Sequence, residues 1–240
     1  MHRVVADGGA STLAALAREA ALPLATAHRL VATMVRSGFL VAAERGRYVA
    51  GPTLLLQAGA ISFNATMAAL ARPVLRRLLR ETGCIAHLGV LENDMVTYLV
   101  KAGGDDDVLF TREGMQLEAY CSGIGKMLLA CLAEPAREEY LSAGPFIALT
   151  PATITAADAL RREFECIRSH DFAIDRGEIA VNLRCVAVPV RGADAQMLAA
   201  ISISRLNTDD DSADHRLIAA ARRRAAELER RLMDALFTER

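Results

Sequence analysis

A stripe of threonine and arginine side chains within the first fifty residues has the chemistry needed to read DNA. Its members recur at steps of three, four and three residues, which places them on one side of an expected helix. They are Thr26, Arg29, Thr33 and Arg36. An arginine in the major groove can bind guanine through two hydrogen bonds, and a threonine can contact a phosphate or the methyl group of thymine. A solvated helix face fits the same pattern, so both interpretations stay open for the stripe alone.

Two helices separated by a short break are expected to position this stripe. Ser11 or Thr12 can cap a first helix, and Pro23 stops that helix while suiting the first turn of the next one. The second helix is expected over residues 24–36. Five of its apolar residues have core-facing spacing: Ala27, Leu30, Val31, Met34 and Val35.

A basic hairpin follows the second helix. Two short strands are expected at residues 39–41 and 48–50, and the turn between them carries Arg45 and Arg47. Arginines at the tip of such a hairpin can contact phosphate groups or the minor groove. The order of elements predicts a winged helix-turn-helix over residues 1–50, whose second helix enters the major groove of double-stranded DNA.

A second group of residues could bind a small anion. Ser202 and Ser204 stand two positions apart on an expected strand, so their hydroxyl groups face the same side. Gly123 and Ile124 lie where a loop meets a helix, and backbone N–H groups at a helix N-terminus can bind an anion. Together these groups favour a small carboxylate. The alternative is that both serines are ordinary strand residues whose hydroxyls are satisfied within the protein.

Three further residues suit the same kind of ligand. Asp175 can accept a hydrogen bond from a ligand hydroxyl. Leu183 and Cys185 can supply apolar contacts, although Cys185 also fits a small core residue.

The motifs of common enzyme classes are incomplete in this sequence. Residues 123–126 (GIGK) begin like a phosphate-binding loop, but that motif requires serine or threonine where Met127 stands. Cys185 as a nucleophile would need a general base, and nothing in the spacing of His87 or His170 selects either. No HExxH pattern and no CxxC pair indicates a metal site. We therefore expect a protein that is not an enzyme and needs no metal or cofactor.

Helices and strands alternate in the larger remainder of the chain, residues 68–240, after a mainly apolar linker helix at residues 51–67. Strands are expected at residues 84–91, 95–101, 108–112, 185–191 and 197–205. Helices are expected at residues 69–80, 124–132 and 156–169, the last with a capping box of Thr155 and Asp158, and at the C-terminus. The pattern predicts an α+β domain with an antiparallel sheet. The apolar linker helix favours burial against a second copy of the chain.

Composition and charge narrow the possible partners. The chain has 240 residues, which fits one large domain or two unequal ones, and its 52% hydrophobic content excludes a disordered chain. Residues 1–50 carry a formal charge of +3, whereas the other 190 residues carry −4. A cationic end on an acidic body is typical of a nucleic-acid-binding module. The polar residues that interrupt the uncharged stretch 48–71 argue against a membrane span, and the absence of a secretory signal predicts a cytoplasmic protein.

In order along the chain, several segments resemble the IclR family of bacterial transcriptional regulators. The N-terminal ones are Leu22-Pro23, Thr26-Ala27-His28-Arg29-Leu30, Gly38-Phe39-Leu40, Gly46-Arg47-Tyr48 and Gly51-Pro52. The C-terminal ones are Ala71-Arg72-Pro73-Val74-Leu75, Glu81-Thr82-Gly83, Gly123-Ile124-Gly125-Lys126, Asp175, residues 183–190 and residues 200–204. No single motif is very specific to the family, but all of them together, in this order and at this spacing, are.

This resemblance implies a GAF-like effector-binding domain, a homodimer or a dimer of dimers, and control of catabolic genes by a small carboxylate or aromatic acid. Operator DNA would be contacted by Thr12, Ala25, Thr26, His28, Arg29, Thr33, Arg36, Arg45 and Arg47. The effector would be contacted by Leu109, Leu117, Gly123, Ile124, Asp175, Leu183, Cys185, Ser202 and Ser204.

The sequence departs from the family pattern at several positions. The family's first helix precedes the position of Gly8-Gly9, where residues 1–6 remain, which indicates either a mis-assigned start or a shortened domain. Leu24-Ala25 replace a basic residue and a serine, Asn182 replaces a glycine, and Arg176-Gly177 interrupt an acidic run. These departures keep an alternative open, namely an effector-binding and dimerisation module whose DNA-binding domain is impaired.

Overall fold

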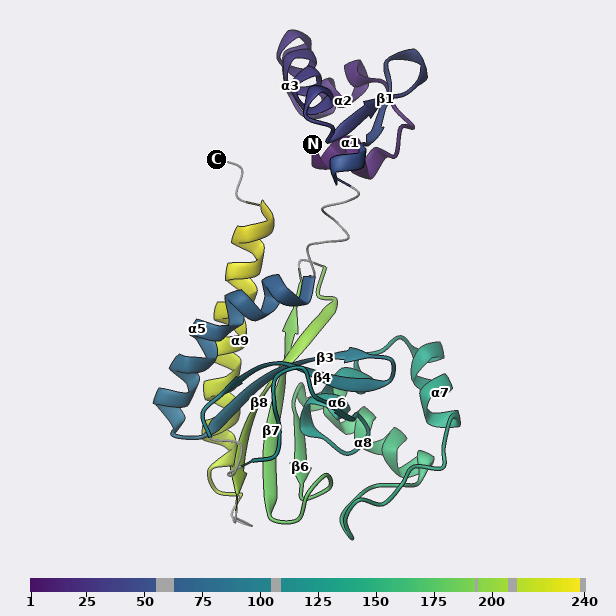
Figure 1. The fold of residues 1–240 in the computed structure, drawn as a ribbon. Helices are drawn as coiled ribbons and strands as arrows, with labels where there is room; N and C mark the ends of the chain where they lie inside the picture. Colours follow the sequence, from purple (N-terminus) through teal and green to yellow (C-terminus); the bar gives the residue numbers. More distant parts are fainter. Residues whose placement is uncertain (55–62, 105–108, 193, 207–210, 238–240) are drawn as a thin grey trace. The chain divides into compact units, whose positions relative to one another are not determined.

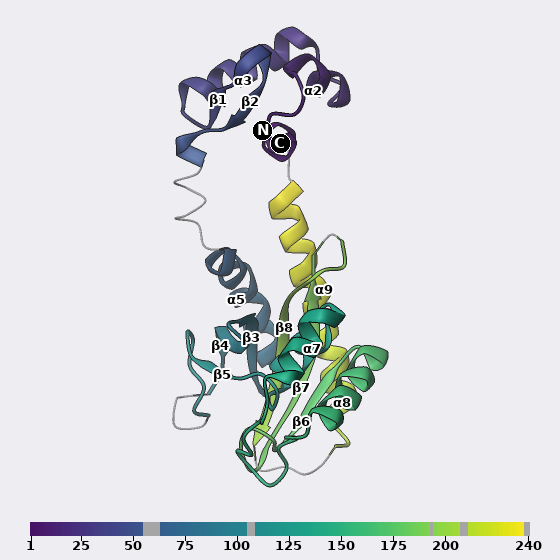
Figure 2. The same cartoon turned by 90° about the vertical axis from the view of Figure 1, so that its right-hand side faces the viewer.

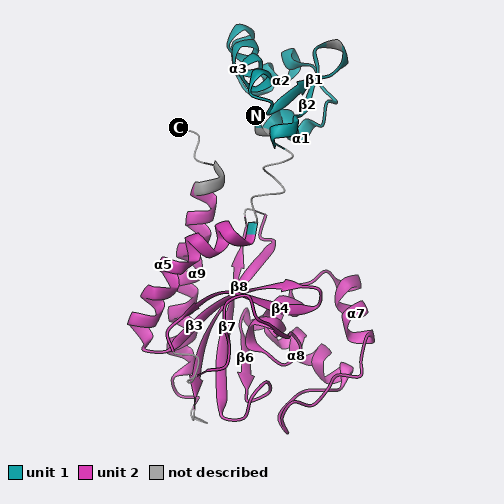
Figure 3. Cartoon of the chain, in the orientation of Figure 1, with its two compact units in different colours: residues 1–63 teal, residues 64–240 magenta. Residues whose placement is uncertain are grey.

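The computed structural model describes the chain except for residues 55–62, 105–108, 193, 207–210 and 238–240. The described residues form two compact units, residues 1–63 and 64–240 (Figure 3). The linker helix predicted over residues 51–67 falls partly on residues 55–62, outside the described part. Its last five residues belong to a longer helix, α5 (Phe63–Thr82).

The N-terminal unit is a helix-turn-helix followed by a hairpin, as predicted. Its elements are α1 (His2–Asp7), α2 (Leu13–Glu19), α3 (Leu24–Arg36), β1 (Leu40–Ala42), the 3-10 turn η1 (Glu44–Gly46) and β2 (Tyr48–Ala50). The two strands pair antiparallel, with Leu40 opposite Ala50. Buried apolar side chains from all three helices and β1 form one core: Val4, Leu13, Leu16, Ala17, Ala27, Val31 and Leu40.

One element of this unit was not predicted and one expectation was wrong. The residues before Gly8 form a short helix, α1, and Val4 anchors it in the core. Leu30 was assigned to the core face of α3, but it is 44% exposed because Ala27 and Val31 occupy the buried side of that helix.

The C-terminal unit contains a six-stranded sheet in which every neighbouring pair of strands is antiparallel (Figure 1). The strand order is β5-β4-β3-β8-β7-β6. The strands are β3 (Ile85–Glu92), β4 (Met95–Ala102), β5 (Gln116–Glu118), β6 (Ala173–Arg176), β7 (Leu183–Arg191) and β8 (Met197–Leu206). The helices other than α5 are α6 (Gly123–Ala130), α7 (Glu134–Ser142), α8 (Ala157–His170) and α9 (Asp214–Phe237).

Helices cover both faces of this sheet (Figures 1 and 2). On one face α5 and α9 bury an aliphatic core with side chains such as Leu88, Val188 and Ile201. On the other face α6 and α8 pack through Ile124 and Phe164 against alternate strand residues. Because successive residues of a strand point to opposite faces, the same strands supply both cores.

A bulge in β4 changes which face its residues meet. Leu88 of β3 pairs with Val100, but the next residue, Gly89, pairs with Tyr98, so Leu99 is an extra residue. Val100 therefore belongs to the core beneath α5 and α9, whereas Tyr98 belongs to the core beneath α6.

Several predicted details of the C-terminal unit differ from the structure. Residues 109–112, the described part of the strand predicted at 108–112, are not a strand, and the edge strand β5 lies further along the chain. The capping box of Thr155 and Asp158 is absent: Ala156 is the N-cap of α8, and Asp158 instead accepts a hydrogen bond from Arg161 at 2.5 Å. Helix α7 and strand β6 were not predicted.

Candidate functional site

The predicted DNA-reading stripe lies on the exposed side of α3. Ala25, His28, Arg29, Thr33 and Arg36 are exposed, and Thr26 is half-buried. The Thr33 hydroxyl donates to the backbone oxygen of Arg29 at 3.1 Å and accepts a hydrogen bond from Arg36 at 3.2 Å. The stripe is thus an accessible row in which one threonine orients one arginine.

The other predicted DNA contacts lie outside α3. Thr12 is the N-cap of α2, where its hydroxyl accepts a hydrogen bond from the backbone N–H of Ala15 at 3.4 Å. Arg47 is exposed at the end of the turn η1. Arg45 lies within η1, and its side chain is outside the described part of the structure. Thr12 therefore has a structural role in the fold, independent of any contact with DNA.

The nine residues predicted to contact an effector all line one cavity of the C-terminal unit. They come from six separate segments of the chain and are Leu109, Leu117, Gly123, Ile124, Asp175, Leu183, Cys185, Ser202 and Ser204. The space between its walls, including the part open to solvent, is about 300 Å³. Eight of the nine residues are buried, and Leu117 is half-buried.

Strand register explains how residues distant in sequence meet there. Asp175 of β6 pairs with Cys185 of β7, and Cys185 pairs with Ser204 of β8. Ser202 pairs with His87 of β3. Residues paired across antiparallel strands point to the same face. The thiol of Cys185 lies 3.2 Å from the hydroxyl oxygen of Ser204, within hydrogen-bonding distance for sulfur.

The N-terminus of α6 closes one wall of the cavity. Ser122 caps this helix by accepting a hydrogen bond from the N–H of Gly125 at 3.1 Å. The N–H groups of Gly123 and Ile124 belong to the first turn, which has no acceptor within the helix. A methyl group on Gly123 would lie 3.4 Å from the Cβ atom of Cys185, so the helix end packs closely against β7.

Six further residues line the cavity that sequence reasoning did not assign to it: His87, Tyr98, Phe110, Thr111, Ser122 and Ile179. His87 lies with its Nε2 atom 2.9 Å from the Thr111 hydroxyl, and its ring meets Tyr98 edge-on at 5.1 Å. Burial lowers the pKa of His87 to about 3, with a smaller contribution from the charge of Lys101. The imidazole is therefore neutral. His87 lies opposite Ser202 and so faces the cavity. The sequence indicated the two strands but not their pairing, which is why His87 was missed.

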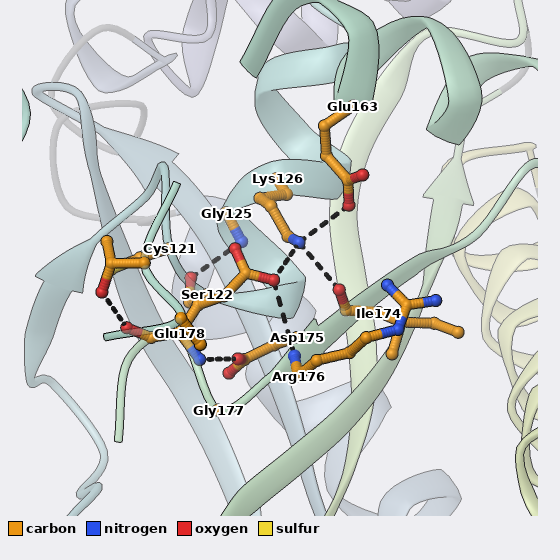
Figure 4. A network of polar contacts seen from close by, with 12 residues as sticks. Cys121, Ser122, Gly125, Lys126, Glu163, Ile174, Asp175, Arg176, Gly177 and Glu178 are labelled. Carbon is orange, nitrogen blue, oxygen red and sulfur yellow. Dashed lines mark hydrogen bonds and ion pairs between the residues drawn. The ribbon is translucent and has the colours of Figure 1, made fainter. Parts of the chain in front are cut away.

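Asp175 is the acidic residue among those that line the cavity. Its Oδ1 atom accepts a hydrogen bond from the N–H of Glu178 at 2.7 Å, while its Oδ2 atom has no hydrogen-bond partner in the described part of the chain (Figure 4). Burial raises the pKa of Asp175 to about 7, and the nearby charge of Glu178 adds to this effect. Asp175 is thus a carboxyl group close to its titration point at neutral pH.

Other features of the described residues do not compete with this site. Two wider clefts, of about 930 and 1040 Å³ including open space, contain none of the predicted residues. No group of three or more His, Cys, Asp or Glu side chains in the described part is arranged to hold a metal ion. None of the helices described is long and apolar enough to span a lipid bilayer.

Comparisons with known proteins cover both units. The family model of the C-terminal domain of bacterial transcriptional regulator IclR matches residues 61–230, and that of the IclR helix-turn-helix domain matches residues 3–43. The uncharacterized HTH-type transcriptional regulator RhmR of Escherichia coli is 30% identical over 91% of this chain and 86% of its own. The transcriptional repressor IclR of the same species is 29% identical over 84% of this chain and 75% of its own.

A solved structure shares the fold across both units. The crystal structure of an IclR homologue from Microbacterium hydrocarbonoxydans, complexed with 4-hydroxybenzoate, matches with a TM-score of 0.63 and 28% identity, covering 91% of this chain and 90% of that one. Since the family models match most of the chain, and since they describe regulators of transcription rather than enzymes, the chain belongs to the IclR family as a DNA-binding transcriptional regulator with an effector-binding domain.

Proposed function

We propose that this regulator binds a small organic acid, a short carboxylate or an aromatic acid, in the cavity beneath α6. The observation that carries the proposal is the convergence of the nine predicted residues, from six segments, on one enclosed cavity. The first-turn N–H groups of α6 can bind a carboxylate, and the two serine hydroxyls on β8 can donate to it. The homologue complexed with 4-hydroxybenzoate supports an aromatic acid as one candidate.

Operator DNA is the second partner in this proposal. Residues 1–50 form the DNA-binding domain, residues 51–67 the linker, and residues 68–240 the effector domain. The exposed stripe of α3, with Arg47 of the hairpin, provides arginines for bases and phosphates. Ala25 and His28 flank this stripe at the same surface. A homodimer or a dimer of dimers would present two such helices to a two-fold operator, typically that of a catabolic gene cluster.

A thermal-shift screen tests the effector. The full-length protein is heated with 4-hydroxybenzoate, other aromatic acids and short carboxylates, and a ligand at one hundred times its Kd is expected to stabilise the folded state by about 2.7 kcal/mol. The double variant Ser202→Ala, Ser204→Ala is expected to lose that stabilisation and the effector response while still binding DNA. Thermal stabilisation that is unchanged in the double variant would contradict the assignment of the cavity.

A gel-shift assay tests the DNA partner. Binding to the promoter of the adjacent gene cluster is measured at several salt concentrations, because release of counterions makes a contact with DNA phosphates weaken as salt rises. Specific, salt-dependent binding is expected. Absence of binding, also in a version extended to an upstream in-frame start, would instead favour an effector-binding module with an impaired DNA-binding domain.

A further inference from the structure

The cavity has an electrostatic feature that matters for an acidic ligand. Its described lining contains one carboxyl group, that of Asp175, and neither lysine nor arginine. His87 is neutral, because burial lowers its pKa. Lys101 lies behind this lining: its ammonium donates to the backbone oxygens of Leu109 and Thr111 at 3.0 and 2.7 Å, and its charge reaches His87. A carboxylate that enters this enclosed space would therefore meet a second carboxylate with no cationic side chain in the lining itself, which is costly at low dielectric.

A buried network of charged side chains next to the cavity adds further negative charge near Asp175 (Figure 4). Lys126 of α6 is fully buried, and its ammonium donates to Glu178 at 2.5 Å, to Glu163 at 2.8 Å and to the backbone oxygen of Ile174 at 2.7 Å. One ammonium thus already serves two carboxylates. Its charge also lowers the pKa of Asp175, but less than burial and the charge of Glu178 raise it.

Glu178 links this network to the cavity. Its backbone N–H holds Oδ1 of Asp175, while its carboxylate binds Lys126. The second carboxylate oxygen of Glu178 is buried and has no hydrogen-bond partner among the described residues. Burial raises the pKa of Glu178, and the charge of Lys126 and its hydrogen bond to Glu178 act against that shift and favour the anion. Glu178 lies three residues from Asp175 and does not line the cavity itself.

The other titratable groups around Asp175 add no positive charge. Tyr98 of β4, Cys121 before α6 and Cys185 of β7 each interact electrostatically with the Asp175 carboxylate. Burial raises the pKa of all three, to about 12 for Cys121, so all are neutral at physiological pH. His87 on β3 is neutral as well. The groups that face Asp175 are thus neutral, except for Glu178 and the ammonium of Lys126 that Glu178 and Glu163 share.

We propose that the cavity binds a carboxylate effector together with a proton on Asp175, which is taken up from solvent wherever Asp175 is ionised, and that Glu178 sets the strength of this coupling. The inference rests on the proposed function of the cavity. The proton neutralises Asp175 and turns its Oδ2 atom into an O–H donor that can point at the ligand carboxylate. Two like charges in one enclosed site are thereby replaced by a hydrogen bond. Glu178 acts as a positioning residue, since it touches Asp175 and not the ligand.

The sign of the pH dependence follows directly. Below the pKa of Asp175, near 7, the proton is already present and carboxylate affinity is constant. Above this pKa the proton must be taken from increasingly dilute solution, so affinity falls by up to tenfold per pH unit. A neutral ligand of the same shape needs no proton, and its affinity does not fall with pH in this way.

Calorimetry with a matched pair of probes tests the coupling. Binding of 4-hydroxybenzoate and of its neutral analogue 4-hydroxybenzamide to the full-length protein is measured from pH 6 to pH 8.5. The affinity for the acid is expected to fall about fifteenfold between pH 7 and pH 8.5, with net proton uptake seen as a heat that depends on the buffer. The amide is expected to bind without this dependence. Acid binding of constant affinity and without proton uptake overturns the proposal.

Two substitutions separate the roles of the carboxyl groups. Asp175→Asn imitates the protonated form, so affinity for the acid is expected to become independent of pH while binding persists. Glu178→Gln removes the neighbouring anion, so the pH at which affinity begins to fall is expected to move downward. A Glu178→Gln profile that coincides with that of the wild type contradicts the assigned role of Glu178.

A measurement without ligand distinguishes failure of this inference from failure of the proposed function. The carboxyl carbon of Asp175 is followed by ¹³C NMR in full-length protein with labelled aspartate, and Asp175→Asn identifies the signal. A titration midpoint near 7, lowered in Glu178→Gln, supports the inference even if neither probe binds. A midpoint near the ordinary value of about 4 for aspartate overturns it, whatever binds in the cavity.

Discussion

The polar residues of α3 and those of the cavity lie in opposite surroundings. On α3, Arg29, Thr33 and Arg36 are exposed to solvent. In the cavity, Asp175 and Ser202 are only 0% and 4% exposed, so their polar atoms depend on partners within the protein or on a ligand. The exposed stripe suits a large partner that docks from outside, whereas the enclosed groups suit a small molecule.

This difference determines how function and stability are related in each region. Replacing an exposed charge away from caps and turns changes stability by about 0.5 kcal/mol or less. Removing one partner of a buried ion pair costs several kcal/mol, because the other charge is left buried and uncompensated. Substitutions on α3 should therefore change DNA binding alone, whereas substitutions in the network beneath the cavity should also change folding.

Replacing Lys126 by methionine tests the buried side of this comparison and has the largest expected effect. The variant keeps most of the side-chain volume but leaves Glu178, which is 3% exposed, without its cation. The free energy of unfolding is expected to fall by about 3–5 kcal/mol, measured by urea denaturation at pH 7. Glu163, which is more exposed, will remain solvated and contribute less of the loss.

Arg36→Met is the matched control for this experiment. It makes the same kind of change on the exposed side of α3, and its expected effect on unfolding is about 0.5 kcal/mol or less. Similar losses in the two variants would show that the network around Lys126 does not depend on a buried charge.

Much of the cavity could be predicted from sequence, because period-two spacing fixes which residues of a strand share a face. Ser202 and Ser204 follow this rule directly, and the family resemblance supplied the residues from other strands. The network beneath them was not predictable in the same way. Lys126 stood out as part of an incomplete phosphate-binding motif and of a segment that resembles the family, and its partners lie 37 and 52 residues further along the chain.

The missed parts of the fold have a similar cause. In β4, Val96, Tyr98, Val100 and Ala102 alternate perfectly and are all buried, yet the bulge at Leu99 divides them between two faces. No residue type in the sequence marks that bulge. The edge strand β5 has three residues, too short for an alternating pattern, and it is defined by its pairing with β4.

Arg29→Ala tests the exposed side of the comparison, with a smaller expected effect. If Arg29 reads a base, the variant should lose about 1–3 kcal/mol of binding free energy for the operator, with little change in unfolding. Fluorescence anisotropy measures the binding free energy of the variant for the operator duplex and for a random duplex. Arg18→Ala, an exposed arginine on α2, serves as the control. Equal losses on operator and random DNA would make Arg29 a phosphate contact.

Thr12→Ala carries the smallest expected effect and tests where the comparison breaks down. Thr12 is exposed like the residues of the α3 stripe, yet its hydroxyl caps α2. We expect a loss of about 1 kcal/mol in the unfolding free energy of the N-terminal unit, as for other N-cap replacements. Thr12→Ser keeps the cap and should restore that stability. If both variants are as stable as the wild type but bind operator DNA more weakly, the main role of Thr12 is to contact DNA and not to cap α2.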